Sequence, residues 1–174
     1  AMRLLRSQAE QWEVDPQRIG VCGFSAGGHL GAMLCAASQS NAYPPVDDVD
    51  RASCRPDFAI LIYPASLSDP SDSAVLDPAF RAIGRRGCPP VFLAAAGDDR
   101  HTGGGLLLSR ELRSAGVRSE CHIYRRGGHG GGIDPVAYPF SEWTKPCRRW
   151  LAELPSPRSS GRDDSEPVRP GRRP

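Results

Sequence analysis

Three runs of consecutive apolar residues, at positions 19–24, 58–63 and 91–96, constrain the fold most strongly. They are continuous rather than alternating, which is typical of parallel strands that are buried on both faces. A further strand over 120–124 alternates enough to lie near an edge of the sheet. Helical patterns separate these strands, and this alternation predicts an α/β fold with a mostly parallel sheet flanked by helices. The expected helices cover residues 2–12, 26–37, 106–115 and 143–154.

The chain of 174 residues fits a single domain with a hydrophobic core. Residues 66–90 follow no regular pattern, and we expect a loop or lid there with one short helix near 76–83. From 155 to 174 the sequence is almost entirely Pro, Arg, Ser, Asp and Gly, without the apolar residues that would offset the entropy of ordering. The sequence therefore predicts a domain over 1–154 and a disordered polar tail over 155–174.

The composition excludes several kinds of partner. The formal net charge of +2 is too small for a phosphate-neutralising surface, so no nucleic-acid partner is expected. No apolar run approaches the roughly 18 residues that span a membrane, so no membrane partner is expected. The six cysteines form no C-x-x-C pair and predict no metal site; Cys22, Cys35 and Cys121 fall inside expected elements, as buried thiols would. The sequence leaves open the compartment, cytoplasmic or secreted, and the oligomeric state.

A G-x-S-x-G pentapeptide occupies residues 23–27, between an expected strand and an expected helix. This is the context in which the motif forms a nucleophile elbow, a sharp strained turn that exposes its serine. Ser25 is therefore the candidate nucleophile. The N–H groups at the start of the following helix point toward the site, so the Ala26 N–H can supply half of an oxyanion hole. A simple Gly/Ser turn between strand and helix is the alternative.

Ser25 needs a histidine base and an orienting carboxylate, because a hydroxyl is a weak nucleophile at neutral pH. Asp99 follows the strand 91–96 at the carboxyl edge of the expected sheet, where open α/β sheets collect their functional groups. The neighbouring Asp98 offers a second carboxylate. We favour Asp99 as the acid, and Asp98 stays open as the alternative.

His129 is the candidate base. It lies in the run Gly-Gly-His-Gly-Gly-Gly just after the strand that ends at Tyr124, where glycines let the backbone bring an imidazole close to Ser25. The order serine, aspartate, histidine along the chain is that of the α/β-hydrolases. His29, His101 and His122 are weaker candidates, because they fall on the expected elbow helix, after the acid loop and within a strand.

Across residues 1–154 the chain resembles the acetylxylan-esterase and feruloyl-esterase-like branch of the α/β-hydrolases. Four segments carry this resemblance: residues 23–30, 55–64, 115–117 and 127–130. It implies a serine esterase that hydrolyses short-chain acyl esters, including esters on carbohydrate, through an acyl-enzyme and without metal or organic cofactor. It also implies that Ser25, Asp99 and His129 form the triad.

The chain departs from the family pattern in two places. It starts just before the nucleophile strand, so we expect a C-terminal part of the fold that lacks the first strands and the His-Gly-Gly loop with the second oxyanion donor. Residues 101–105, His-Thr-Gly-Gly-Gly, replace an apolar, proline-containing turn. Two further interpretations therefore stay open: a truncated hydrolase remnant without activity, and a serine peptidase of the prolyl-oligopeptidase type.

Overall fold

A computed structural model describes residues 1–37, 43–81, 83 and 87–155. Its centre is a four-stranded sheet whose strands are all parallel and follow one another in the order β1-β2-β3-β4. The strands are β1 (Val21–Phe24), β2 (Ala59–Ile62), β3 (Val91–Ala96) and β4 (Ser119–Tyr124). The predicted parallel α/β sheet is confirmed, and β4 lies at an edge as its alternating sequence indicated.

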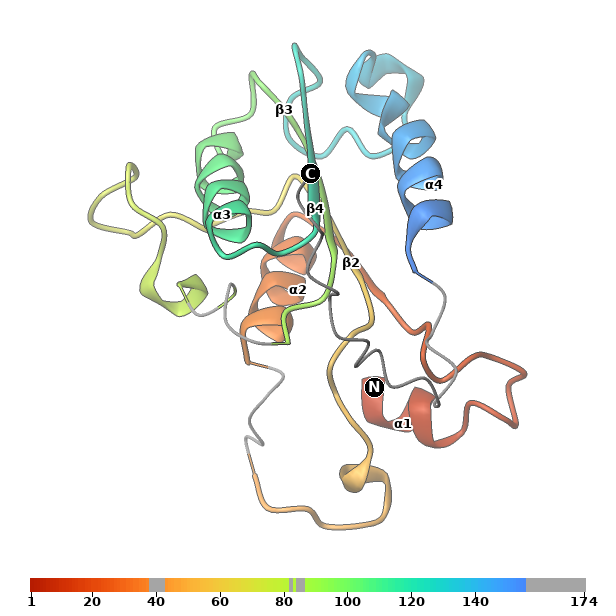
Figure 1. Cartoon of the computed structure of the whole chain (residues 1–174). Helices are drawn as coiled ribbons and strands as arrows, with labels where there is room; N and C mark the ends of the chain where they lie inside the picture. Colours follow the sequence, from red (N-terminus) through yellow and green to blue (C-terminus); the bar gives the residue numbers. More distant parts are fainter. Residues whose placement is uncertain (38–42, 82, 84–86, 156–174) are drawn as a thin grey trace, which may run out of the picture.

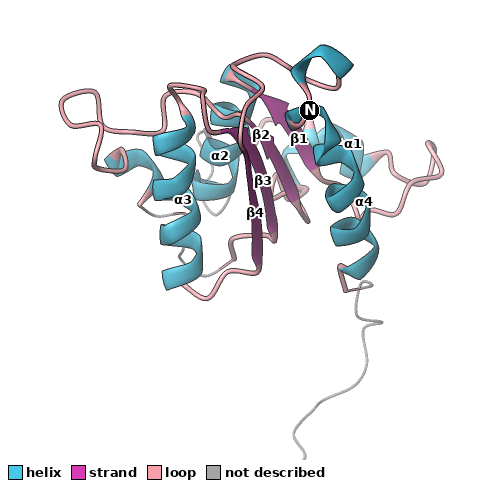
Figure 2. Ribbon diagram, turned by 90° about the horizontal axis from the view of Figure 1, so that it is seen from above, coloured by secondary structure: helices cyan, strands magenta, loops and turns pink. Residues whose placement is uncertain are grey.

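Helices cover both faces of the sheet. Helices α2 (Ala26–Ala37) and α3 (Thr102–Ser114) lie on one side, while α1 (Met2–Ser7) and α4 (Thr144–Glu153) lie on the other (Figures 1 and 2). Short 3₁₀ turns complete the described part: Val49–Arg51, Pro78–Phe80, Pro135–Ala137 and Phe140–Trp143. None of the helices in the described ranges is long and apolar enough to cross a bilayer.

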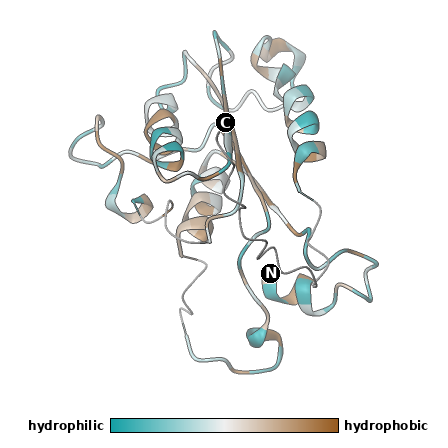
Figure 3. Cartoon of the chain, viewed as in Figure 1, coloured by the Kyte–Doolittle hydropathy of each residue, from teal (hydrophilic) through white to brown (hydrophobic). Residues whose placement is uncertain are grey.

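The two sheet faces have separate cores because side chains alternate along each strand. Leu61 and Leu93 pack with Leu108 and Leu112 of α3 on one face. On the other face, Ile62 and Phe92 pack with Phe140, Trp143 and Trp150. Both faces of β2 and β3 are buried, as the continuous apolar runs predicted. The helices α3 and α4 are amphipathic and mix hydrophilic and hydrophobic residues (Figure 3).

The outer strand β1 is less protected than the two central strands. Cys22 and the Phe24 side chain are exposed there, Phe24 to 41%. The expectation that Cys22 is a buried thiol is therefore wrong, because a strand with a neighbour on only one side leaves alternate side chains uncovered. Cys35 is buried, Cys121 is half-buried, and all six cysteines are free thiols.

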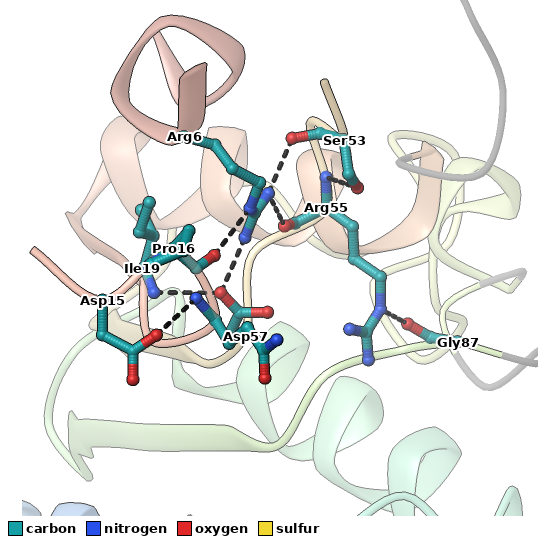
Figure 4. Close-up of polar contacts among 9 residues, drawn as sticks. Arg6, Asp15, Pro16, Ile19, Ser53, Arg55, Asp57 and Gly87 are labelled. Carbon is teal, nitrogen blue, oxygen red and sulfur yellow. Dashed lines mark hydrogen bonds and ion pairs between the residues drawn. The ribbon is translucent and has the colours of Figure 1, made fainter. Parts of the chain in front are cut away.

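A polar cluster around Arg6 joins the segments that lead into β1 and β2 (Figure 4). The Arg6 guanidinium donates to the backbone carbonyls of Pro16, Ser53 and Arg55 and pairs with Asp57 at 2.6 Å. The same Asp57 oxygen accepts from Ile19 N at 2.9 Å. This cluster fixes the entry to β1 and β2, the strands that end at Phe24 and Ile62, so it supports the site from the opposite end of the sheet.

Several element boundaries differ from expectation. Helix α1 ends at Ser7 instead of reaching residue 12, because the chain turns back to bring the Pro16 carbonyl to Arg6. Helix α3 begins at Thr102, four residues early, and includes three glycines. In the 66–90 segment the described residues form a 3₁₀ turn at Pro78–Phe80 and an isolated bridge between Ser68 and Leu76. The expected tail lies outside the described residues from 156 onward.

Candidate active site

Ser25 occupies the turn between β1 and α2 with a positive φ of 52°, a strained conformation for a residue with a side chain. Its N–H donates to the Ile62 carbonyl at 3.0 Å, which ties the turn to β2. A Cβ on Gly23 would lie 2.1 Å from the Gly27 carbonyl oxygen, whereas a Cβ on Gly27 would meet nothing within 4 Å. Steric crowding at the elbow thus explains the first motif glycine but not the second.

The structure brings Ser25, His129 and Asp99 together from three separate loops. Ser25 Oγ lies 2.6 Å from His129 Nε2, and His129 Nδ1 lies 2.8 Å from Asp99 Oδ2. Because a carboxylate can only accept, the His129 proton belongs on Nδ1, which leaves the Nε2 lone pair facing the serine hydroxyl. This is the arrangement in which an imidazole can remove the serine proton.

Asp99 is held rigidly in the turn after β3. The residue is 5% exposed, its second oxygen accepts from His101 N at 3.0 Å, and its backbone N–H donates to the Ala96 carbonyl. Thr102 adds a buried hydrogen bond from its hydroxyl to the same carbonyl. These contacts aim the carboxylate at His129 and leave it little rotational freedom.

Asp98 has different hydrogen-bond partners from Asp99. Its Oδ1 accepts from the backbone N–H groups of Gly127 and Gly128, at 3.0 and 2.9 Å. Asp98 is exposed, and its carboxylate clamps the start of the loop that carries His129. The sequence pattern offered both aspartates to the same role, but the fold gives them different contacts.

The far end of the same loop is anchored at Gly132. The Trp143 indole N–H donates to the Gly132 carbonyl at 2.9 Å, and the Gly132 N–H donates to the Tyr63 hydroxyl. At the near end, Gly127 has a φ of 152°, and a Cβ there would lie 2.3 Å from Phe140. Glycine is therefore required at 127 if the loop is to pack this closely.

Tyr63 is a site residue that the sequence interpretation missed. It directly follows β2, has a φ of 36°, and places its ring against the His129 imidazole with the centroids 5.1 Å apart. Burial raises the pKa of the Tyr63 hydroxyl, and the hydrogen bond from Gly132 opposes that shift. Its position at the carboxyl end of a parallel strand was the available signal, since functional groups gather at that edge.

The remaining histidines differ in their distance from the triad. His29 packs edge-on against Phe80 and lies within hydrogen-bond distance of the Ala65 and Ser66 carbonyls, so it anchors the loop after β2. His122 pairs with Glu120 on β4. His101 lies closest to the triad, with its ring centroid 4.9 Å from that of His129.

Ala26 is the first residue of α2. The N–H groups of a helix's first turn have no acceptor within the helix, so the Ala26 N–H is available beside Ser25. Its role as an oxyanion donor stays a prediction.

Comparisons with known proteins agree with this architecture. The BD-FAE family profile matches residues 1–59. An acetylxylan esterase of Xylanibacter ruminicola is 26% identical over 90% of this chain and 35% of its own length. The esterase LipI of Mycobacterium tuberculosis is 28% identical over 79% of this chain and 51% of its own length. The chain thus spans about a third to a half of these curated relatives.

Solved structures extend the likeness. The acetyl ester-xyloside bifunctional hydrolase of Caldicellulosiruptor lactoaceticus superposes with a TM-score of 0.74 and 33% identity, over 87% of this chain and 62% of the other. Est2 of Thermogutta terrifontis shares the fold with a TM-score of 0.71 at 23% identity, over 92% and 64%. The expected resemblance is confirmed: the chain has part of the α/β-hydrolase fold and is similar in sequence and structure to esterases of that fold.

Proposed function

We propose that this chain carries the active site of a carboxylic ester hydrolase, with Ser25 as nucleophile, His129 as general base and Asp99 as the orienting acid. The observation that carries the proposal is the unbroken pair of contacts from Ser25 Oγ through the His129 imidazole to Asp99. The esterase names of the relatives support ester hydrolysis over other serine chemistry.

The proposed reaction uses these contacts in turn. His129 Nε2 takes the hydroxyl proton as Ser25 Oγ attacks the ester carbonyl carbon, and Asp99 stabilises the imidazolium that forms. The Ala26 N–H donates to the oxyanion of the tetrahedral intermediate. The imidazolium then gives its proton to the departing alcohol, which leaves Ser25 acylated. A water molecule repeats the attack with His129 as base, releasing the carboxylic acid and restoring the serine hydroxyl.

A hollow beside His101 carries several hydroxyl groups, which favours a hydroxyl-rich alcohol as the leaving group. It has a volume of about 210 Å³ and borders His101, the neighbour of His129. Ser66, Ser68, Ser73 and Arg100 line it, together with the apolar Leu67. Serine hydroxyls can both donate to and accept from sugar hydroxyls, which supports a carbohydrate as the alcohol part of the substrate. The name of the acetylxylan esterase relative supports a short acyl part.

A larger apolar cavity does not border the histidines beside the triad. It has a volume of about 500 Å³ and lies between α1 and α2, lined by Met2, Leu30, Leu34 and Val49 among others. Ser25, Asp99 and His129 line neither this cavity nor the hollow; the hollow is preferred because it borders His101, whose ring lies 4.9 Å from that of His129.

Labelling with a fluorophosphonate probe tests the nucleophile. We expect one adduct, located on Ser25 by mass spectrometry, and its loss in Ser25→Ala. Ser7→Ala, which removes an exposed serine on α1, is the matched control and keeps the label. Absence of an adduct at Ser25 in the folded chain would show a triad without chemistry and overturn the proposal.

The substrate class is tested separately. The ratio of turnover on acetylated xylo-oligosaccharides to turnover on p-nitrophenyl acetate is measured in the parent and in Ser68→Ala. We expect the substitution to lower this ratio, because it removes a hollow hydroxyl but no triad group. An unchanged ratio refutes the role of the hollow, and hydrolysis of peptide anilides in preference to esters would instead favour a peptidase.

A further inference from the structure

His101 forms a cluster of potential metal ligands with two residues of the triad, and ester hydrolysis does not use this cluster. Asp99, His101 and His129 each present a ligand atom, and these three atoms lie within 4.8 Å of one another. Two imidazoles and one carboxylate form a donor set that Zn²⁺ accepts readily. Among the described residues this cluster brings two histidines to the buried Asp99 carboxylate.

The existing distances are near those of a tetrahedral site. Metal–ligand bonds of about 2.0–2.2 Å place two ligand atoms roughly 3.3 Å apart around a tetrahedral ion. Asp99 Oδ2 and His129 Nδ1 are already 2.8 Å apart, so they must separate by less than about 1 Å. The ligand atom of His101 must approach by roughly 1–2 Å, which a rotation of its half-buried side chain can supply.

We propose that Asp99, His101 and His129 form a zinc site whose occupation switches the triad off. His129 coordinates through Nδ1, the nitrogen that faces Asp99, while Nε2 faces Ser25. A neutral imidazole has one proton, so a metal on Nδ1 moves that proton to Nε2. Nε2 then has no lone pair to accept the Ser25 proton, and zinc binding and hydrolysis exclude each other.

Arg100 is the group that opposes the ion. Its Nε donates to His101 Nε2 at 3.2 Å, which occupies a nitrogen lone pair and places a positive charge beside the site. Arg100 is exposed, so its guanidinium can turn into solvent when zinc arrives. Removing the guanidinium therefore strengthens zinc binding, whereas removing the His101 imidazole weakens it.

Calorimetric titration of the full chain with zinc chloride at neutral pH tests the site itself and needs no enzymatic activity. We expect His101→Gln to weaken zinc binding by at least about tenfold, since loss of even an outer-shell partner costs 10–100-fold. Arg100→Ala should tighten binding. His122→Gln is the matched control, because it removes a histidine on β4 and keeps all six thiols. Equal affinity in the parent and in His101→Gln overturns the site.

The inhibitory role rests on the proposed esterase function and is tested by a second readout. Esterase activity of each variant is expressed relative to its own zinc-free rate, and a chelator should restore it. We expect His101→Gln to need at least about ten times more zinc for half-inhibition than the parent. If zinc binds through His101 but the parent keeps its full esterase rate, the inhibitory switch is refuted while the zinc site stands. Lack of activity without zinc instead refutes the esterase proposal.

Discussion

Replacement of Asp98 separates a residue that positions the His129 loop from the acid that orients the imidazole. Asp98→Ala removes two hydrogen bonds from backbone N–H groups, at 3.0 and 2.9 Å, to an exposed carboxylate. Each such bond to a charged group is worth about 1.5–3 kcal/mol when protected from water. Discounted for exposure, we expect a combined loss of about 1–2 kcal/mol in the free energy that holds the loop in its productive position.

That loss corresponds to a decrease of about 5–30-fold in kcat, since 1.36 kcal/mol is tenfold in rate. Asp99→Asn should cost far more, on the order of 10⁴-fold, because the equivalent change in a serine protease triad stabilises the wrong imidazole tautomer. Asp98→Asn supplies the rescue, since an amide oxygen can still accept from Gly127 N and Gly128 N. We expect it to recover most of the kcat lost in Asp98→Ala.

The assay is steady-state hydrolysis of p-nitrophenyl acetate by each variant, with folding checked by circular dichroism. The reasoning predicts a mild defect for Asp98→Ala, a partial recovery for Asp98→Asn and a severe defect for Asp99→Asn. The opposite order, with Asp98→Asn as damaging as removal of the triad acid and Asp99→Asn mild, would identify Asp98 as the acid.

Three further predictions concern stability. Arg6→Ala should lower the free energy of unfolding, measured by urea titration, by about 2–3 kcal/mol, because it breaks the pair with Asp57 and three carbonyl contacts. Arg6→Lys lacks the guanidinium fork and should restore little of the lost stability. Gly23→Ala should destabilise by about 3 kcal/mol or more, since its Cβ meets backbone at 2.1 Å, whereas Gly27→Ala, into open space, should change stability by less than about 1 kcal/mol. Burial raises the pKa of the Cys35 thiol from 9.0 to about 12, so the stability from the neutral thiol is present below pH 9 and lost as pH rises toward 12. The melting temperature of the parent should therefore fall more steeply above pH 9 than that of Cys35→Ala, and parallel slopes would contradict this.

The order and type of the main elements were available from the sequence because local patterns carry that information. The continuous apolar runs became β2 and β3, buried on both faces, and the small-residue helix after Ser25 became α2 at its predicted bounds. Boundaries failed where contacts distant in sequence decide them. Helix α1 ends early because Arg6 binds carbonyls some 10 to 49 residues away. The early start of α3 has a local cause instead, the hydrogen bond from the Thr102 hydroxyl to the Ala96 carbonyl.

The sequence by itself determined which residue types could meet: a serine on an elbow, an aspartate after β3 and a histidine in a glycine-rich loop after β4. Parallel strands send these loops to one edge of the sheet, so their proximity followed from the element order. Only the tertiary structure distinguishes the contacts of Asp98 from those of Asp99. Adjacent side chains on a turn diverge, and the packing of the His129 loop against Tyr63 and Phe140 determines which carboxylate meets the imidazole and which one holds the backbone.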